Sequence, residues 1–545
     1  MIEIYVDGKS VALEKGCSVR DFLYNNNKQS EVLAYKVNNK IADKDYVFEN
    51  EDEVVSLTIE TDEGYLIYKE TLILILIDAA EQLYGAAPVS VRQSVNKSTY
   101  FEIEGVLKDK ENVAIGIKNK MKEIVAKDKP PTFFVTDRQS AAKLFEECEM
   151  FTRAEDVKKL PTDKVKMCRA GERYHITYQG VSYSVSAIKS FDIIPYEDGF
   201  LLRYPTNYSN GEIPPTVDSR KIHSAIEDYR DWTQTLGAAD IFSLNRFIRE
   251  GKASDIINLS EGLHEKRLSR IADTIKSRPD LKVILIAGPS SSGKTTFANR
   301  LCLHLRINHL SPVVISLDDY YVDDTRMPRD SKGEMDFESV EAIDYKLFNE
   351  HLSLLTEGKS VTLPRYDFTV RKQKVGETLQ IGEGQIIIVE GIHALNELLT
   401  SRVDKKNKYK IYLSALTSLC LDEYNAFSPT DNRLLRRIVR DAAFRNTPAE
   451  ETFYLWKNVR KGEHKYIFPF ESEADEVFNS SLVYELAVLK EPALKLLSTI
   501  TEKSVHYSRA QRLMELLSYF ETLNKENVPP TSFLREFVGG STILK

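Results

Sequence analysis

The sequence predicts a multidomain α/β protein whose C-terminal half is a doubly wound parallel sheet. The first observation is the length, because 545 residues exceed what one hydrophobic core serves and indicate three or four domains of about 150 residues each. The second is a series of short apolar runs, each separated from the next by a longer segment with helical potential. These runs are residues 283–287, 313–317, 386–389 and 409–413. Buried strands that alternate with helices are typical of a parallel sheet covered on both faces.

The composition is that of a soluble globular protein and argues against several classes. Hydrophobic residues make up 42% of the chain, and 74 lysines and arginines stand against 82 aspartates and glutamates, for a net charge of −8. This balance argues against a strongly basic chain that coats nucleic acid, although a local basic patch stays open. The longest aliphatic run near the N-terminus, Leu72–Ile77, is far shorter than the roughly 20 residues that span a bilayer. The first residues carry no secretory signal, so we expect a cytoplasmic protein without a membrane partner.

Cysteine and histidine spacing predicts no structural metal site. The five cysteines are Cys17, Cys148, Cys168, Cys302 and Cys420, and no two of them form a CxxC pair. Reduced thiols are therefore expected. The nine histidines also lack the spacing of paired ligands, so zinc is not predicted.

The N-terminal residues alternate in the manner of β-strands. Apolar residues alternate along residues 2–6, before a turn at Asp7 and Gly8, and again along residues 54–59. Residues 66–84 have the apolar pattern of a buried helix.

The following stretch, residues 88–215, mixes short strand-like runs with helix-like ones. From Lys221 to Ser277 the pattern is helical and predicts a connector. The last 45 residues begin as a helix and pass through Pro529 and Pro530. We expect that end to be a tail docked on the body of the protein.

The strongest motif in the chain runs from Gly288 to Thr295, with the sequence GPSSSGKT. It fits the pattern GxxxxGK[ST], and it stands directly after the apolar run VILIA and before the helical segment FANRLCLHLRI. Glycines in such a loop let backbone N–H groups turn inward around phosphate oxygens, and the following helix N-terminus adds a favourable dipole. We expect Lys294 to reach the β- and γ-phosphates of a nucleotide and Thr295 to ligate Mg²⁺. The residues predicted to bind the nucleotide are Gly288, Ser290, Ser291, Ser292, Gly293, Lys294, Thr295 and Thr296.

Acidic residues follow two of the predicted strands. Asp318 and Asp319 come directly after residues 313–317, and Glu390 comes directly after residues 386–389. Ligands bind beyond the carboxyl ends of strands in open α/β sheets, so these acids should lie beside the phosphate loop. Asp318 can then accept a proton from an attacking hydroxyl or hold Mg²⁺, and Glu390 can serve the metal. Simple helix capping or solvation is the alternative for these acids.

Five arginines gather within residues 433–445 of this acidic chain. They are Arg433, Arg436, Arg437, Arg440 and Arg445. Positions 433, 437 and 440 share one helix face, and such a concentration of positive charge predicts an anion. In a phosphotransferase that anion is the transferring phosphoryl group. A solvated helix face paired with Asp431 and Asp441 is the alternative.

No base-reading motif of a GTPase is present. Such a protein needs NKxD after a strand, and LNKEN at residues 523–527 lacks the aspartate. The P-loop therefore favours a kinase over a G protein.

Seven motifs in the C-terminal half resemble, in their order, those of the uridine kinase and phosphoribulokinase family. They are GPSSSGKTT, SLDDYY, MDFESVEAID, LPRYDF, IIIVEGIHALN, DNRLLRRIVRD and ADEVFNSS, within about residues 280–490. The resemblance implies ATP-dependent phosphorylation of a hydroxyl group on a small molecule, with Mg²⁺. Asp318 lies where uridine kinases carry their catalytic aspartate, and Glu338 and Tyr366 lie at positions that help hold the nucleoside. The stretch that matches the family's mobile lid contains Arg436, Arg437 and Arg440.

The predicted site then has four parts. The catalytic residues are Lys294, Asp318, Arg437 and Arg440, and Arg436 joins the nucleotide-binding residues. The residues predicted to bind the acceptor are Asp318, Glu338, Tyr366, Arg371, Arg433 and Arg445. The predicted metal ligands are Thr295 and Glu390.

Two residues depart from the family's pattern on the acceptor side. Glu338 stands where uridine kinases have an aspartate that grips the ribose hydroxyls, and Arg371 stands where they have a histidine that contacts the pyrimidine. A pocket built to hydrogen-bond one substrate rejects another strongly. Uridine is the leading acceptor, while an anionic or phosphorylated sugar would suit Arg371 better.

The N-terminal half resembles the front of threonyl-tRNA synthetases. IYVDGKSVALEKGCSVRDFL and VLAYKVNNKI resemble a TGS domain, a small ubiquitin-like β-grasp module, and the residues up to about 215 resemble the editing-type domain that follows it. Synthetases carry an HxxxH pair there, which falls on Ile73 and Ile77, and a later CxxxH, which falls on Tyr178 and Ser182. All four polar groups are missing, so we expect no editing or metal chemistry. The remaining roles for this half are a binding or regulatory module, or simply packing against the kinase domain.

The sequence thus predicts five segments and one leading function. The segments are a TGS-like β-grasp module at 1–61, an editing-like α+β domain at 62–217, a helical connector at 218–278, a kinase domain at 279–495, and a C-terminal helix and tail at 496–545. The leading function is a nucleoside kinase, and the alternatives are a sugar or sugar phosphate kinase and a nucleotide-gated protein that binds RNA such as tRNA. The acidic balance argues against RNA, because phosphate contacts need clustered lysines and arginines. Homo-oligomer formation and the choice between ATP and GTP stay open.

Overall fold

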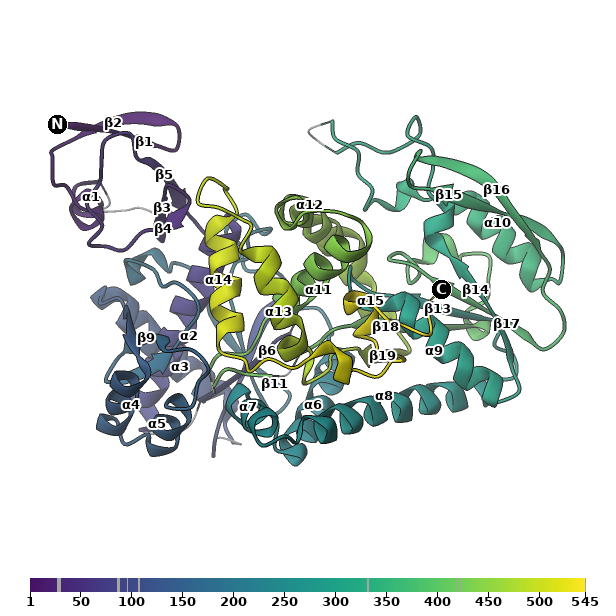
Figure 1. Cartoon of the computed structure of the whole chain (residues 1–545), viewed down its shortest axis with the longest axis horizontal. Coiled ribbons are helices and arrows are strands. Elements are labelled where there is room, and N and C mark those ends of the chain that lie inside the picture. Colours follow the sequence, from purple (N-terminus) through teal and green to yellow (C-terminus); the bar gives the residue numbers. More distant parts are fainter. Residues whose placement is uncertain are drawn as a thin grey trace.

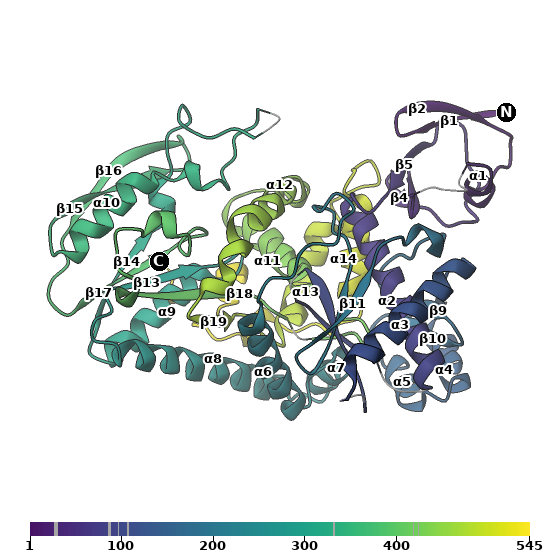
Figure 2. The same cartoon turned by 180° about the vertical axis from the view of Figure 1, so that it is seen from behind.

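The chain forms an elongated molecule with a small sheet near its N-terminus and a parallel sheet toward the opposite end (Figure 1). This computed structural model describes residues 1–26, 31–85, 89–95, 97–105, 108–330, 333–417, 419–422 and 424–544. Both views show the long helix α8 (Ala253–Lys276) running along one side and leading into the parallel sheet (Figures 1 and 2).

The N-terminal sheet contains five strands and one helix. Its elements are β1 (Ile2–Val6), β2 (Lys9–Leu13), α1 (Val19–Asn26), β3 (Ala34–Val37), β4 (Lys40–Ile41) and β5 (Glu53–Leu57). The strand order is β2-β1-β5-β3-β4, and β5 runs parallel to β1. Asp7 and Gly8 turn between β1 and β2 with φ angles of 49° and 77°, which short polar residues and glycine tolerate. The two predicted strands of this region are confirmed.

The middle of the chain is built around helix α2 (Asp62–Tyr84), which is buried along most of its length. The Thr61 side chain caps its first turn by accepting from Gly64 N at 3.0 Å, as the predicted buried helix requires. An antiparallel sheet of order β11-β12-β7-β6 and a second one of order β10-β9-β8 accompany it. These strands are β6 (Val89–Val95), β7 (Ser98–Ile103), β8 (Thr132–Asp137), β9 (Lys164–Ala170), β10 (Arg173–Ile176), β11 (Asp192–Tyr196) and β12 (Gly199–Arg203). The helices beside them are α3 (Lys110–Lys127), α4 (Arg138–Glu147) and α5 (Phe151–Val157).

Three helices form the connector that the sequence predicts. They are α6 (Arg220–Leu236), α7 (Ile241–Arg249) and α8. The side chain of Asp240 caps α7 by accepting from Ser243 N at 2.8 Å. Buried residues of α8, such as Leu268 and Ile271, join the same hydrophobic core as the parallel sheet, so the connector is an integral part of the kinase half.

The C-terminal half contains a five-stranded sheet in which every strand runs parallel to its neighbours. Its strands are β13 (Val283–Ala287), β14 (Ser311–Ser316), β17 (Gln385–Glu390), β18 (Lys408–Ser414) and β19 (Glu476–Asn479), in the order β14-β17-β13-β18-β19. The four predicted strands are confirmed, and β19 is an additional one. The other elements are α9 (Lys294–Ile307), α10 (Tyr345–Thr356), the hairpin β15 (Val361–Asp367) and β16 (Lys372–Leu379), α11 (Pro429–Phe444), α12 (Ala449–Gly462) and α13 (Glu485–Leu497). Since β13 lies in the middle, the loop after it opens at the centre of the sheet edge.

The C-terminal residues return to the body of the molecule. Helix α14 (Tyr507–Ser518) packs on α13, and the short helix α15 (Arg535–Val538) lies on α11. The predicted docking of this tail is therefore confirmed, and its place is next to the start of α9, where the Phe533 ring faces Gly293.

Two findings bear on the environment of the protein. Within the described ranges, no helix combines the length and apolar character needed to cross a bilayer. The cysteines are free thiols, and Cys302 is buried in the core.

Candidate active site

The loop after β13 takes a shape that only glycine permits at two points. A Cβ atom at Gly288 would lie 1.9 Å from the carbonyl oxygen of Leu413 on β18, so the loop passes in direct backbone contact with the neighbouring strand. Gly293 has a φ of 91° and opens helix α9, and this left-handed conformation favours glycine. The loop therefore leads the chain tightly from the sheet edge into the helix N-terminus.

Lys294 folds back over this loop. Its Nζ donates to the carbonyl oxygens of Gly288 at 3.0 Å and Pro289 at 3.3 Å. Burial lowers the pKa of Lys294, while the nearby carboxyl groups of Glu390 and Asp318 oppose this shift. The ammonium group thus lies between the loop and two acids, where an incoming phosphate would meet it.

Two carboxyl groups face Lys294 from adjacent strands. Glu390 ends β17, and its Oε1 accepts from Ser316 Oγ at 2.9 Å across the β14–β17 pairing. Burial, together with the charge of Asp318, raises the pKa of Glu390 to about 7. Asp318 stands on the turn just after β14 and is open to solvent, although the surrounding protein raises its pKa and Lys294 opposes this. Asp318 and Glu390 therefore lie beside the phosphate loop, where the sequence predicted them.

Three arginines surround one buried carboxylate beside the loop. Asp441 is 2% exposed and forms ion pairs with Arg437 at 3.1 Å, Arg440 at 2.8 Å and Arg445 at 3.5 Å. Arg437 Nη1 also donates to Ser290 Oγ of the loop at 2.7 Å. One carboxylate cannot neutralise three guanidinium groups, so this cluster keeps positive charge beside the phosphate loop.

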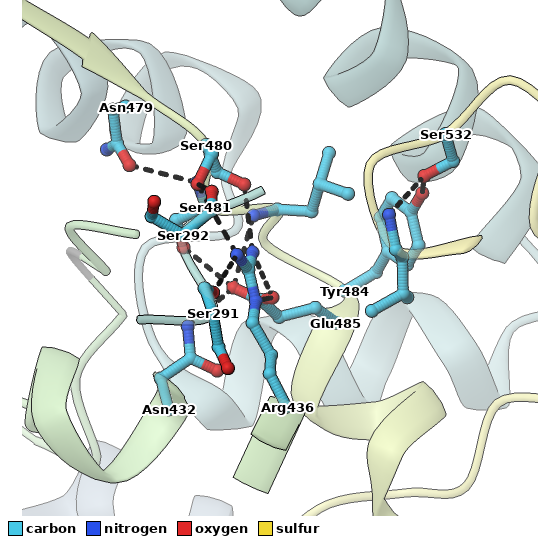
Figure 3. Close-up of polar contacts among 12 residues, drawn as sticks. Ser291, Ser292, Asn432, Arg436, Asn479, Ser480, Ser481, Tyr484, Glu485 and Ser532 are labelled. Carbon is cyan, nitrogen blue, oxygen red and sulfur yellow. Dashed lines mark hydrogen bonds and ion pairs between the residues drawn. The ribbon is translucent and has the colours of Figure 1, made fainter. Parts of the chain in front are cut away.

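Arg436 lies behind the loop and is fully occupied by protein partners (Figure 3). It pairs with Glu485 at 2.5 Å and donates to the carbonyl oxygen of Ser480 at 2.9 Å and that of Ser291 at 3.4 Å. The Ser480 hydroxyl in turn donates to the carbonyl oxygen of Ser292 at 2.6 Å. The structure therefore differs from the expectation of a lid residue that binds nucleotide directly. A buried guanidinium paired with a carboxylate is held in one position, and here it stabilises the loop through the carbonyl oxygen of Ser291.

Arg433 differs from its expected role for the same physical reason. It is 2% exposed and forms a buried ion pair with Glu463, which also accepts from Arg460 Nη1 at 2.6 Å. Arg433 donates to Ser290 O at 3.0 Å, and Ser290 N donates to Glu463 at 3.1 Å. The pair therefore positions the loop and offers no free face to an acceptor.

The C-terminal segment supplies residues that motif reasoning missed. Thr295 is exposed, so its side chain is open to a metal ion, but Thr296 is buried and its hydroxyl donates to Glu536 Oε2 at 2.6 Å. A Cβ atom at Gly293 would lie 3.1 Å from the ring of Phe533. No sequence motif indicates either contact, because Phe533 and Glu536 are each 240 residues away from the loop residue that they contact.

Glu338, which was predicted to bind the acceptor, lies close to the end of α12. Burial and the charge of Glu463 raise the pKa of Glu338 to about 7, and Arg437 and Lys294 oppose them. A Cβ atom at Gly462 would lie only 2.3 Å from Glu338 Cβ. The missing side chain at position 462 therefore makes the space that Glu338 occupies.

An aromatic cluster lies beside these acids. The ring centroids of Tyr321, Tyr366 and Phe368 are 4.9 to 5.8 Å apart, in tilted and edge-on arrangements. The Arg371 guanidinium lies 5.7 Å from the centre of the Phe337 ring. The hydroxyl of Tyr366 is buried and has no hydrogen-bond partner among the described residues. Flat rings with one free hydroxyl and one cation suit a ligand with a ring and polar groups.

Comparison with known proteins places these motifs in a family context. Residues 283–485 match the sequence profile described as the "Phosphoribulokinase / Uridine kinase family". A protein named "Uridine kinase" from Staphylococcus haemolyticus is 33% identical over 195 residues, which cover 35% of this chain and 84% of that protein. One of the same name from Borrelia turicatae is 34% identical over 202 residues, covering 36% and 84%. Another from Ureaplasma parvum is 29% identical over 177 residues, covering 32% and 77%.

Proposed function

Because the chain belongs to the phosphoribulokinase and uridine kinase family and is therefore a kinase that transfers phosphate to a hydroxyl group, we propose that ATP with Mg²⁺ is its donor and a nucleoside such as uridine its acceptor. The observation that carries this proposal is the arrangement of Lys294 between the phosphate loop and the carboxyl groups of Asp318 and Glu390. Phosphoryl transfer needs a cation for the phosphates, a carboxylate for the acceptor hydroxyl and a carboxylate for the metal, all close to one another.

The phosphate loop has the unused polar groups that a nucleotide would need. The hydroxyls of Ser291 and Ser292 are buried and have no hydrogen-bond partner among the described residues. Buried hydroxyls are rarely left unpaired, so they support a phosphate ligand at this loop. Thr295 and Glu390 would hold Mg²⁺, which neutralises charge on the phosphates when bound.

The chain's own residues account for the remaining chemistry. Asp318 accepts the proton of the acceptor hydroxyl as its oxygen forms a bond to the γ-phosphorus and the bond to the leaving β-phosphate oxygen breaks. Lys294, Arg437 and Arg440 meet the negative charge of the transferring group. The carboxylate of Glu338 accepts hydrogen bonds from the acceptor's other hydroxyls.

The aromatic cluster supports a nucleoside as acceptor. Tyr321, Tyr366 and Phe368 offer ring faces and edges to a base, and the free Tyr366 hydroxyl offers a hydrogen bond. Arg371 supports a second candidate, a sugar phosphate, because its guanidinium can pair with a phosphate. The two candidates differ only in the acceptor, and ATP with Mg²⁺ is the proposed donor in both cases.

A panel of nucleosides, sugars and sugar phosphates, assayed for acceptor-dependent ADP release, tests the proposal. We expect uridine to give the highest kcat/KM and sugar phosphates to give little release. Asp318→Ala should lower kcat by about 10²–10⁴-fold, and Lys294→Ala by at least about 10²-fold. Asp255→Asn, on the exposed first turn of α8, serves as the control. Normal turnover in Asp318→Ala would show that the base is assigned wrongly.

We further propose that the N-terminal half is a β-grasp module followed by an editing-like domain without metal chemistry. The strand order β2-β1-β5-β3-β4 supports the first part. The second part is supported by Ile73, Ile77, Tyr178 and Ser182, which are buried and supply no metal-ligating imidazole or thiolate. A salt titration of tRNA binding tests the RNA alternative, which needs binding at about 50 mM salt that weakens steeply as salt rises.

A further inference from the structure

A second cavity lies where the two halves of the molecule meet. It has a volume of about 420 Å³ and is lined by residues of α2, β6, β18, the start of α11, the end of α12, and α14. This size falls in the range of small-molecule sites, about 300–1,000 Å³. Lys294, Asp318 and Glu390 do not line it, so it is separate from the phosphate site.

The lining of this interdomain cavity carries an excess of positive charge. Seven lysines and arginines and five aspartates and glutamates contribute to it. Burial raises the pKa values of two of these acids, Glu70 and Glu471, to about 7. Near neutral pH both carboxyl groups are therefore partly protonated, and the balance favours an anion.

Several polar groups in the lining lack a full partner. The only hydrogen bond that Lys69 Nζ makes within the described part of the chain is a long one, 3.4 Å, to Ser94 Oγ. The nearest carboxylate to Arg509 is that of Asp62, at 3.6 Å. Gln179 is 8% exposed, and its Oε1 has no hydrogen-bond partner among the described residues. A buried group such as the Gln179 amide and two partly buried cations left in this state indicate that a ligand completes them.

Flat rings lie beside these charges. The Tyr208 ring lies on the His464 ring with centroids 4.5 Å apart, and Tyr65 and Tyr178 also line the cavity. Burial and the charge of Arg460 lower the pKa of His464 to about 3, so this ring is neutral at physiological pH. Neutral rings next to cations suit a ligand that combines a flat ring with an anionic group.

We propose that the interdomain cavity is a second binding site, for a small organic anion with a flat ring, of the nucleoside phosphate class. Lys69 and Arg509 would meet the anionic group, and the Gln179 amide would meet a polar edge of the ring. This site goes beyond the kinase reaction and does not depend on which hydroxyl is phosphorylated.

An ion-pair chain connects the cavity to the phosphate loop. Arg460 and Arg433 both line the cavity, and both bind Glu463, which holds Ser290 N at 3.1 Å. A ligand that draws Arg460 toward the cavity weakens its pairing with Glu463 and so changes the support of the loop. Because coupling between two sites is reciprocal, ATP and the second ligand should alter each other's affinity.

Calorimetric titration of the full chain with UMP, AMP and inorganic phosphate tests this proposal. We expect at least one nucleotide to bind with an affinity that Lys69→Gln lowers at least tenfold and that Lys294→Ala leaves unchanged. Arg509→Gln should have the same effect, and Lys122→Gln, which changes an exposed lysine on α3, should have none. Thermal unfolding of each variant checks that it folds.

The outcomes separate this site from the kinase site. Nucleotide binding that is lost in Lys294→Ala but kept in Lys69→Gln belongs to the phosphate loop and overturns the proposal. The absence of binding by all three probes overturns it as well. Binding of inorganic phosphate as tight as that of the nucleotides would overturn the ring part of the assignment. None of these results depends on finding the correct acceptor for the kinase.

Discussion

Gly462 decides where Glu338 can lie, because the two residues are in direct contact. A Cβ atom at position 462 would approach Glu338 Cβ to 2.3 Å and Cγ to 2.7 Å. We predict that Gly462→Ala displaces Glu338 and raises the KM for the acceptor at least tenfold, with little change in the KM for ATP. Steady-state kinetics with each substrate varied in turn measures both effects.

The matched control is Gly262→Ala on α8. A Cβ atom there meets nothing within 4 Å, and alanine in a helix interior is more stable than glycine by about 0.5–1 kcal/mol. The control should keep both KM values. An equal rise of the two KM values in Gly462→Ala would contradict a specific effect on Glu338.

The pKa of Glu338 predicts a pH dependence of acceptor binding. Burial first, and then the charge of Glu463, raise this pKa from 4.5 to about 7. Below that value the carboxyl group is protonated and accepts hydrogen bonds poorly, so the KM for the acceptor should rise as the pH falls from 8 to 6. Kinetics across this range measure the change. Glu338→Gln, whose side chain cannot titrate, should make the profile shallower, and an unchanged slope in that variant would contradict the assignment.

Motif residues were predictable from the sequence, and the support behind them was not. The loop residues Gly288 to Thr295 follow a pattern whose local geometry a short segment dictates. Whether an arginine of α11 is free to bind phosphate depends instead on carboxylates that are distant in the sequence. Arg433 meets Glu463, and Arg436 meets Glu485, and nothing in the local pattern distinguishes these two from Arg437.

At the scale of elements, one buried ion pair joins α11 to the turn after α12. Arg433 and Glu463 are both almost fully buried. Burial raises the pKa of Glu463, but Arg433 and Arg460 more than offset this and lower it to about 2. Glu463→Gln removes the charge and leaves two arginines uncompensated. We predict a loss of about 3–5 kcal/mol in the free energy of unfolding at pH 7, measured by urea denaturation.

The same pair has a defined pH window. Since the pKa of Glu463 lies below its ordinary value of 4.5, its contribution is complete above that pH and declines as the pH falls toward 2. The difference between the unchanged protein and Glu463→Gln should shrink over this range. A difference that stays constant down to pH 2 would contradict the ion pair as its cause. Glu451→Gln, on an exposed residue of α12, is the control.

Apolar runs predicted the central strands well, because β13 and β17 are buried on both faces and consist of almost continuous hydrophobic stretches. β18 is buried as well, although Lys408 and Lys410 interrupt its apolar residues. β19 (Glu476–Asn479) has only four residues, too few for a periodic signal. The segment that leads into α15 packs its Phe533 ring against Gly293. The sequence pattern does not predict this contact, because glycine has no side chain that could indicate a partner.

At the scale of the whole molecule, residues of both halves, among them Tyr178 and Phe427, pack into one hydrophobic cluster. Asn425 Nδ2 donates to Ile176 O at 2.8 Å, and the Phe427 ring lies 6.1 Å from that of Tyr178. We predict that a chain of residues 218–545 has a Tm lower than the full chain by at least about 10 °C, because removal exposes buried apolar side chains such as Phe427. Differential scanning calorimetry measures both.

Removal of residues 1–57 alone provides the comparison. Contacts of that sheet with α14 and the loop before it are mainly polar, such as Lys36 Nζ to Val505 O at 3.2 Å and Asn39 Nδ2 to Glu502 O at 3.0 Å. The sheet also packs on the middle of the chain, where the ring centroids of Tyr35 and Tyr183 are 6.3 Å apart, but its removal leaves the cluster around Tyr178 and Phe427 in place. The decrease in Tm should therefore be smaller. An unchanged Tm for residues 218–545 would show that the kinase half folds independently.

Domain-level resemblance could name the parts of the chain but could not show how they meet. Each motif describes contacts within its own segment, whereas Arg512 of α14 pairs with Asp431 of α11 at 2.7 Å across 81 residues. The cavity between the halves arises only from such contacts. Its lining residues come from segments that no single motif contains.

The contact between the C-terminal segment and the phosphate loop also has a consequence for protein synthesis. Thr296 and its partner Glu536 are 240 residues apart, so a ribosome that adds about 5–20 residues per second makes the second roughly 10–50 s after the first. Throughout this interval the nascent loop lacks the wall that Phe533 and Glu536 form. A prematurely terminated chain therefore never acquires a finished phosphate site, and only chains translated past this segment can acquire one.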